Sequence, residues 1–232
     1  MTGDAKPGRM RLAVFGGGPI GVEAALYGAT LGHDVVLYES GELGNAVSMW
    51  RHLALFSPWR MNTTPLGLRT LAEAGRPLPD PAAYPTGAQL IEEYLQPLAE
   101  TARLRGRLRT QSRVVAVGRS GLRKTDLLPP SVRAARPFRI LVEDSAGERI
   151  EVADAVLDCS GTYLCPNAIG DGGIAAPGER WLEQRLIRHL PDVLGAQRKR
   201  FAGQRVLLIG AGLSAATAAV ELSALCAAEP TT

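Results

Sequence analysis

The sequence predicts an α/β protein with a parallel sheet and, beside it, a small antiparallel β-hairpin or meander. Short apolar runs that suit buried parallel strands precede glycine-rich turns and helical segments near residues 10 and 205. Between them, two segments of alternating character flank Asp144-Ser145-Ala146-Gly147, which indicates a hairpin. Apolar residues make up 46% of the chain and charged residues 21%, which is ordinary for a globular protein.

The N-terminal segment has the pattern of a βαβ unit of about 30 residues. We expect a buried strand over residues 10–15, a helix over 19–31 and a second strand over 35–38 that ends at Glu39. The apolar face of this helix is expected to consist of Ile20, Ala24, Tyr27 and Leu31.

The following 47 positions, residues 40–86, are rich in Gly, Pro, Trp and Asn. They predict an irregular connection, which at such a length is usually functional or partly helical. In chain order, the elements expected after it are a helix over 87–104, a strand over 114–117, a basic surface loop over 120–137, the hairpin over 138–152, a strand over 155–159, a polar helical segment over 179–200, a strand over 205–209 and an alanine-rich helix over 213–228.

Residues 16–21, Gly-Gly-Gly-Pro-Ile-Gly, fit the pattern G-x-G-x-x-G between the first strand and the first helix. Gly16 allows the tight turn, Gly18 lets the backbone approach a pyrophosphate, and Gly21 lets the helix pack close to the strand. The N-terminus of the helix directs N–H groups and the positive end of its dipole at the phosphates. The motif therefore predicts a dinucleotide site.

Glu39, followed by Ser40, stands at the end of the second strand. An acidic side chain there can accept hydrogen bonds from both ribose hydroxyls, and it would repel a 2′-phosphate. The expected ligand is therefore FAD or NAD rather than NADP. The alternative is a glycine-rich turn in an ordinary α/β domain, which the coincidence of strand, glycines, helix, second strand and acidic end disfavours.

A second motif, G-x-G-x-x-A, covers residues 210–215 and again follows an apolar run and opens a helix. It predicts a second dinucleotide site, with a turn that merely packs a strand on a helix as the alternative. The residue that separates NADH from NADPH would lie about 20 positions further on, beyond Thr232, so this choice stays open.

The order of these motifs resembles the two-dinucleotide-domain flavoproteins, and within them the flavin-containing monooxygenase-like and thioredoxin-reductase-like oxidoreductases. The resemblance implies a Rossmann-like FAD-binding fold together with the first strand and helix of a second, NAD(P)H-binding Rossmann-like domain. It implies that FAD is bound by Gly16, Gly18, Pro19, Ile20, Gly21, Glu39, Ser40, Trp50, Val114, Ser160 and Gly161, and NAD(P)H by Gly210, Gly212, Ser214 and Ala215.

Two stretches carry the rest of the resemblance. Val114, with Ser112 and Val117, is similar to the strand whose backbone meets the adenine, and residues 154–163 are similar to the crossover between the two domains. In that crossover Cys159-Ser160 replaces the family's Ala-Thr. The paired cysteines of the disulfide reductases are missing, so thiol–disulfide relay is not expected.

Residues 44–66 occupy the stretch that in the family runs under the isoalloxazine ring. Their aromatic side chains are candidates to stack on the flavin, with a place in the core as the alternative. Nearby cationic groups are candidates to stabilise a reduced flavin anion. The aromatic candidates are Trp50, Phe56 and Trp59, and the cationic ones are Arg51, His52 and Arg60. No catalytic residue is assigned.

The resemblance implies an FAD-binding domain over residues 1–165, a linker and helical segment over 166–202, and an incomplete NAD(P)H-binding domain over 203–232. The expected function, in the complete form of the protein, is an FAD-dependent oxidoreductase that uses NAD(P)H to reduce its flavin and acts on oxygen or a small-molecule substrate. The choice between a monooxygenase and a reductase stays open. The alternative is a truncated nucleotide-binding fragment without turnover. A single-site NAD-binding reductase is a weaker interpretation.

The composition and the residue patterns argue against three other classes of protein: nucleic-acid-binding proteins, membrane-spanning proteins, and enzymes with a hydrolase-type or metal site. The net charge of +3 is spread along the chain and aromatic residues make up 5%, which indicates a solvated basic surface rather than a nucleic-acid interface. No stretch of about 18 charge-free apolar residues predicts a membrane span, and no cleavable leader is recognisable, so a cytoplasmic location is expected. No Ser-His-Asp, paired-carboxylate or metal-ligand pattern occurs. The oligomeric state and the substrate stay open.

Overall fold

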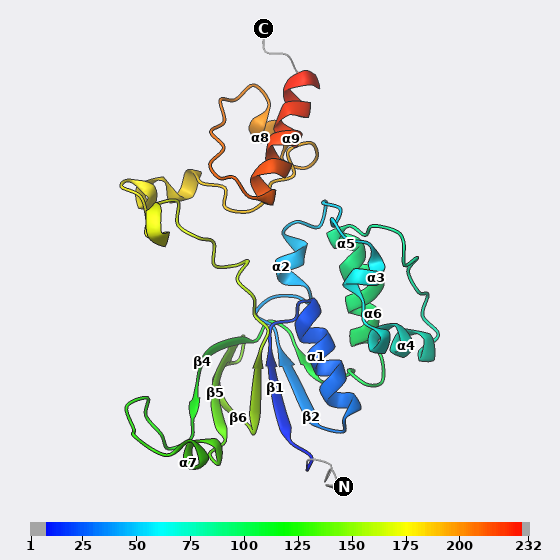
Figure 1. Ribbon diagram of the computed structural model, residues 1–232, viewed down its shortest axis with the longest axis vertical. Coiled ribbons are helices and arrows are strands. Elements are labelled where there is room, and N and C mark those ends of the chain that lie inside the picture. The colour runs from blue at the N-terminus through cyan, green and yellow to red at the C-terminus, as the bar shows by residue number, and fades with distance from the viewer. Residues whose placement is uncertain (1–7, 229–232) are drawn as a thin grey trace. The chain divides into compact units, whose positions relative to one another are not determined.

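The structure is a computed structural model that describes residues 8–228 (Figure 1). Residues 1–7 and 229–232, at the outer ends of the expected first and last domains, lie outside the described residues. The chain divides into two compact units. Unit 1 comprises Met1–Ser48 and Ala54–Gly161, and unit 2 comprises Met49–Leu53 and Thr162–Thr232. Among residues 8–228, no helix combines the length and the apolar character that a membrane crossing requires.

Unit 1 contains a parallel sheet with the strand order β3-β2-β1-β7. Leu12 of β1 pairs with Val35 of β2 on one side and with Ala155 of β7 on the other. The order of the strands thus reverses at β1, and ligands of open α/β sheets bind outside the carboxyl ends of the strands at such a point. The strands are β1 (Arg11–Phe15), β2 (Asp34–Tyr38), β3 (Leu108–Arg109) and β7 (Ala155–Asp158).

The second sheet of unit 1 is antiparallel, with the order β4-β5-β6. Its strands are β4 (Arg113–Arg119), β5 (Phe138–Asp144) and β6 (Gly147–Ala153). The expected hairpin is confirmed, because β5 and β6 pair from Phe138↔Ala153 to Asp144↔Gly147. Gly147 has a φ of +107°, which an L side chain rarely adopts.

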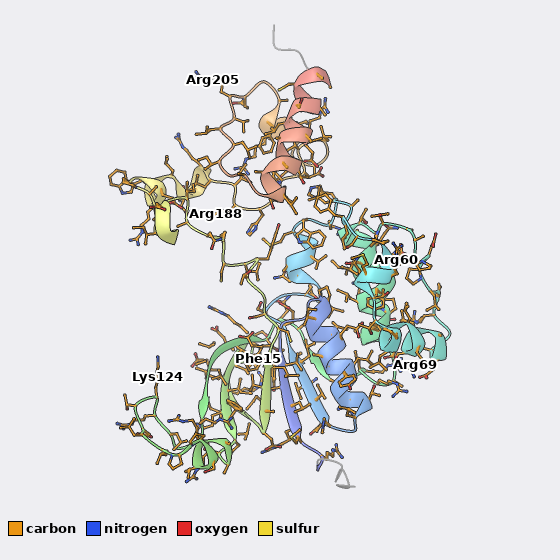
Figure 2. The ribbon with its side chains drawn as sticks, in the orientation of Figure 1. Phe15, Arg60, Arg69, Lys124, Arg188 and Arg205 are labelled. Atoms are coloured by element: carbon orange, nitrogen blue, oxygen red, sulfur yellow. The ribbon has the colours of Figure 1, made fainter. Side chains whose placement is uncertain are left out.

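Successive side chains of each strand point to opposite faces of the parallel sheet, and each face is covered by another layer. Leu12 and Val35 face α1, since a Cβ added at Gly28 of that helix would lie 3.0 Å from each of their side chains. The opposite face, which includes Phe15 at the carboxyl end of β1 (Figure 2), packs against the antiparallel sheet. The cluster between the sheets consists of Ala13, Phe15, Tyr38, Ile140, Val142 and Ala153.

The helix after β1 is confirmed, but its expected apolar face is wrong. Ile20 and Tyr27 are 71% and 60% exposed, and Leu31 is also exposed. The helix instead buries Gly21, Val22, Ala25, Leu26 and Gly28. Gly21 packs against the carbonyl oxygen of Gly16, directly after β1. This close approach fixes the rotation of the helix, so that Val22 and Leu26 are buried while Ile20, Tyr27 and Leu31 are exposed.

The helices of unit 1 include several that the sequence did not predict. Short helices interrupt the expected irregular connection, and a five-residue helix lies within the expected basic loop. The helix expected over 87–104 ends at Ala99 and contains a π-helical turn. The bounds are α1 (Pro19–Thr30), α2 (Asn45–Ser48), α3 (Trp59–Asn62), α4 (Pro65–Glu73), α5 (Gly87–Gln89), the π-turn η1 (Leu90–Leu95), α6 (Gln96–Ala99) and α7 (Pro130–Ala134).

Unit 2 has no strand among its described residues. Its elements are the 3₁₀ turns η2 (Asp171–Gly173) and η3 (Glu179–Arg185) and the helices α8 (Arg198–Phe201) and α9 (Leu213–Ala228). The alanine-rich helix is confirmed. The strand expected over residues 205–209 is wrong: this segment forms no ladder, because a parallel strand needs a paired neighbour and none lies in the described part of the unit. Val193, Phe201 and Leu225 form a small buried cluster.

The helix expected over residues 179–200 is also wrong, since only η3 and α8 form there. The buried carboxylate of Glu179 accepts hydrogen bonds from the N–H of Ala176 at 2.7 Å and of Ile169 at 3.0 Å. It also accepts one from Arg188 Nη2 at 2.9 Å. These bonds, that from Ala176 foremost, lower the pKa of Glu179. They fold residues 169–188 around one carboxylate instead of into a continuous helix.

Candidate functional site

The first glycine motif lies at the carboxyl end of β1, where the chain turns into α1. Gly16 has a φ of +95°, and its N–H donates to the carbonyl oxygen of Tyr38 at 2.8 Å. A Cβ added at Gly16 would lie 2.6 Å from the carbonyl oxygen of Cys159. A Cβ added at Gly21 would overlap the carbonyl oxygen of Gly16. The packing of the protein itself therefore requires glycine at both positions.

Gly18 differs from these two glycines, because nothing lies within 4 Å of a Cβ added to it. It is the N-cap residue of α1, where no side chain caps the helix, and Pro19 is the first helical residue. Ile20 follows with its side chain exposed. An uncapped helix N-terminus beside open space is a place where backbone N–H groups and the helix dipole attract an anion.

The carboxylate of Glu39 stands directly behind the glycine turn. It is 7% exposed and accepts a hydrogen bond from the N–H of Gly17 at 2.6 Å. Its other oxygen accepts from the N–H of Gly41 at 2.8 Å and from the hydroxyl of Ser40 at 3.1 Å. These bonds hold Glu39 in one orientation. A carboxylate has about four acceptor positions, which leaves capacity for a ligand hydroxyl.

The segment before β4 runs beside Glu39. The N–H of Ser112 donates to the carbonyl oxygen of Glu39 at 2.8 Å, and the N–H of Gln111 donates to that of Gly41 at 3.0 Å. Gln111 has a φ of +50°. Val114 follows at the start of β4, and its side chain packs on the cluster between the two sheets. The backbone of this segment therefore borders the same edge as Glu39.

The carboxyl end of β7 completes the edge. Asp158 pairs in register with Phe15, and its Oδ1 accepts from the N–H and the hydroxyl of Ser160, at 3.1 and 2.6 Å. These bonds lower the pKa of Asp158. Ser160 lies against the glycine turn, since its Cα is 2.8 Å from a Cβ added at Gly16. Gly161 follows with a φ of +67°. Sequence reasoning missed Asp158, although an acidic residue that ends a strand was a usable signal.

The other expected residues fall in unit 2. Trp50 belongs to the segment Met49–Leu53. The second glycine motif lies in an exposed turn, where Gly210 has a φ of +130° and nothing lies within 4 Å of a Cβ added at Gly212. Ser214 and Ala215 are in the first turn of α9. This turn is not preceded by a paired strand in the described residues, so the second motif lacks the sheet against which the first is built.

The aromatic candidates for the flavin wall separate into different environments. Trp59 is 2% exposed and packs against Tyr94 with ring centroids 6.3 Å apart, so the alternative, a place in the core, applies to it. Phe56 and Arg60 are exposed. His52 Nε2 is buried and has no hydrogen-bond partner among the described residues. In residues 8–228, no three His, Cys, Asp or Glu side chains are arranged to hold a metal ion.

Neither the protein-family models nor the curated proteins contain a match to this chain. Among solved structures, the bacillithiol disulfide reductase of Staphylococcus aureus matches 94% of this chain and 60% of its own, with a TM-score of 0.62 and 17% identity. A flavin-containing monooxygenase from Stenotrophomonas maltophilia matches 66% of this chain and 38% of its own, with a TM-score of 0.44 and 22% identity. The flavin-dependent halogenase CmlS matches 67% of this chain and 30% of its own, with a TM-score of 0.45 and 23% identity.

The chain thus spans between 30% and 60% of the length of these structures. The likeness to the bacillithiol disulfide reductase shows the fold: the chain has a Rossmann-type α/β fold, as the sequence predicts.

Proposed function

We propose that unit 1 binds FAD and that the chain acts as an FAD-dependent oxidoreductase. One observation carries this proposal. Gly16 and Gly21 are required by the packing of the protein, whereas Gly18 faces open space at an uncapped helix N-terminus. A glycine that packing does not require, placed at an uncapped helix N-terminus, suits a ligand whose phosphates approach the backbone there.

The residues around this glycine fit the parts of FAD. The backbone of Gly18, Pro19 and Ile20 would receive the pyrophosphate, while the oriented carboxylate of Glu39, with Ser40 beside it, would accept the ribose hydroxyls. We assign the backbone before Val114 to the adenine side. Ser160 and Gly161, which adjoin the glycine turn, are assigned to the flavin side, and Trp50 remains a candidate there.

When bound, FAD supplies the redox chemistry, accepting a hydride from a reduced nicotinamide and passing electrons to oxygen or another acceptor. We propose NAD(P)H as the electron donor because of the second glycine motif, Gly210, Gly212, Ser214 and Ala215. In this scheme residues 1–165 form the FAD-binding domain, residues 166–202 a connection and residues 203–232 the nicotinamide side. The acceptor would be oxygen with a small-molecule substrate, as in a monooxygenase, or a small molecule alone.

A second candidate is a nucleotide-binding protein without turnover. It is favoured by residues 205–209, which stay unpaired before the second motif. The two candidates are distinguished by measuring the oxidation of NADH and NADPH by the FAD-loaded protein. The assay follows the loss of the absorbance of the reduced nicotinamide at about 340 nm. Turnover above the rate of free FAD supports the oxidoreductase, and its absence with FAD bound supports the second candidate.

The test of FAD binding is the substitution Gly18→Ala. A methyl group would enter the space assigned to the phosphate oxygens, so we expect FAD affinity to fall at least about tenfold. The melting temperature without ligand should fall only slightly, because alanine is a weaker N-cap than glycine but no protein atom lies within 4 Å of the added carbon. The matched control is Gly118→Ala in β4, where the added carbon also meets nothing within 4 Å. Wild-type affinity in Gly18→Ala would place the ligand elsewhere.

A further inference from the structure

The helical region after Thr86 contains a π-helical turn, η1, at Leu90–Leu95. The N–H of Gln96 donates to the carbonyl oxygen of Ile91, which closes this wider turn. Turns of this kind are rare and occur frequently at functional sites. The side chains that η1 buries are Leu90, Ile91, Tyr94 and Leu95. Two separate series of contacts connect these side chains to the glycine motif, one through Gly44 and one through Glu23 of α1.

The first series passes through Gly44. A Cβ added at Gly44 would lie 2.8 Å from Ile91 Cγ1 and 3.6 Å from Leu95 Cδ1, so the π-turn packs directly on this backbone. The N–H of Gly44 donates to the carbonyl oxygen of Gly17 at 2.9 Å. The N–H of Gly17 in turn donates to Glu39 at 2.6 Å. The peptide groups of Gly17 are therefore held on both sides, and one of those sides is backed by η1.

The second series passes through Tyr94, a fully buried residue of η1. Its hydroxyl donates to the carboxylate of Glu23 in α1 and accepts from the N–H of Thr64 at 3.0 Å. The other oxygen of Glu23 accepts from the hydroxyl of Thr64 at 2.8 Å. Burial, reinforced by the bond to Glu23, raises the pKa of Tyr94, so the phenol keeps its proton at neutral pH.

Gly67 packs directly against the hydrogen-bonded groups of Tyr94 and Glu23. A Cβ added at Gly67 would lie 2.7 Å from Glu23 Oε1, and it would overlap the hydroxyl of Tyr94. Glu23 stands one turn into α1, the helix that begins directly after Gly18. The hydrogen bond from Tyr94 to Glu23 therefore restrains the N-terminal part of α1. Gly17, which lies just before this helix, is restrained separately through its bond to Gly44.

We propose that the π-turn η1 positions the glycine turn of the dinucleotide site, with Tyr94 as the positioning residue. Ile91 and Leu95 support the Gly44 side of the turn, and Tyr94 fixes α1 through Glu23. The role in ligand binding rests on the proposed FAD site, whereas the mechanical link between Tyr94 and the glycine turn stands on the contacts alone. Preorganised backbone groups bind a ligand at a smaller ordering cost, which is the advantage of this support.

The experiment compares Tyr94→Phe with Thr101→Val in the full chain. Each substitution deletes one buried hydroxyl of unit 1, but the hydroxyl of Thr101 donates to the carbonyl oxygen of Leu98, at 2.6 Å, rather than to Glu23 of α1. Hydrogen exchange of the ligand-free proteins is measured over residues 12–26 and 40–48, and FAD affinity by titration below the melting range of both variants.

We expect Tyr94→Phe to speed the exchange of the Gly17 and Gly44 amides about tenfold and to weaken FAD binding about fivefold to tenfold, a usual size for coupling between linked sites. Thr101→Val should leave both unchanged. Wild-type exchange rates in Tyr94→Phe, or equal changes in the two variants, would overturn the positioning role. If the wild-type chain binds no FAD, the proposed function fails, while the exchange result still decides the mechanical link.

Discussion

The two units of this chain use the same type of glycine motif in contrasting surroundings. In unit 1 the motif joins a paired strand to a helix, and a Cβ added at Gly16 would lie 2.6 Å from the carbonyl oxygen of Cys159, the residue after β7. In unit 2 the motif follows an unpaired segment, and a Cβ at Gly210 would meet only the side chain of Ala215, at 3.7 Å. The glycine pattern therefore becomes a constrained turn only where a sheet holds the strand before it.

Burial follows the same division. Both faces of the parallel sheet in unit 1 are covered, one by α1 and the other by the antiparallel sheet. In unit 2 the small cluster of Val193, Phe201 and Leu225 buries little, and Leu207 is 83% exposed. Helices and strands bury an apolar face only against another layer, and unit 2 provides almost none among its described residues.

The largest difference between the units should come from Gly21→Ala set against Gly212→Ala. The first would force a methyl group into the carbonyl oxygen of Gly16, and we expect it to destabilise unit 1 by about 3 kcal/mol or more. The second meets open space and should change stability by less than about 0.5 kcal/mol. Urea unfolding followed by circular dichroism measures both. Equal stabilities would show that the two motifs are constrained alike.

A smaller difference is expected in the rate of proteolysis. Arg205 and Arg139 are both exposed arginines, but Arg205 lies in an unpaired segment and Arg139 pairs on both sides within β5. Cleavage needs an extended, unpaired backbone, so trypsin should cut after Arg205 at least about tenfold faster than after Arg139. Mass spectrometry of a brief digest measures the ratio. Comparable rates would mean that residues 204–212 are protected by contacts of their own.

The smallest effect concerns an ion pair at the edge of unit 1. Arg11 Nη2 lies 2.6 Å from Asp154 Oδ1, and the hydrogen bonds from Arg11 lower the pKa of Asp154 to about 2. The pair therefore contributes its full stability above pH about 4, the ordinary range of a carboxyl group, and loses it as the pH falls towards 2. The side chain of Asp154 is 38% exposed, so solvent screens the interaction and the effect is slight.

Asp154→Asn should accordingly lower the urea midpoint slightly and equally at pH 7 and pH 5, taken as two points above about pH 4. The difference from wild type should shrink at about pH 3 and in about 1 M NaCl, which screens exposed charges. A difference that grows as the pH falls would contradict the stated direction of the pKa shift.

Much of unit 1 was predictable because its signals are local. The βαβ unit, the hairpin and the glycine turn appear where the patterns placed them, and Glu39 stands behind the turn. The buried face of α1 was not predictable, because apolar residues occur all around the helix and only the approach of Gly21 to β1 selects a face. Trp59 shows the same limit, since an aromatic side chain suits a core as well as a ligand.

Turn chemistry and strand periodicity act over a few residues, so the α/β fold class, the position of the first glycine motif and the place of Glu39 at the end of β2 could be predicted from the sequence. Three features became visible only in the folded chain: which glycines packing requires, the contact of Tyr94 with Glu23, and the unpaired state of residues 205–209. These features depend on contacts between segments far apart in the chain. A local pattern specifies a strand's capacity to pair, and the presence of a neighbour decides whether it does.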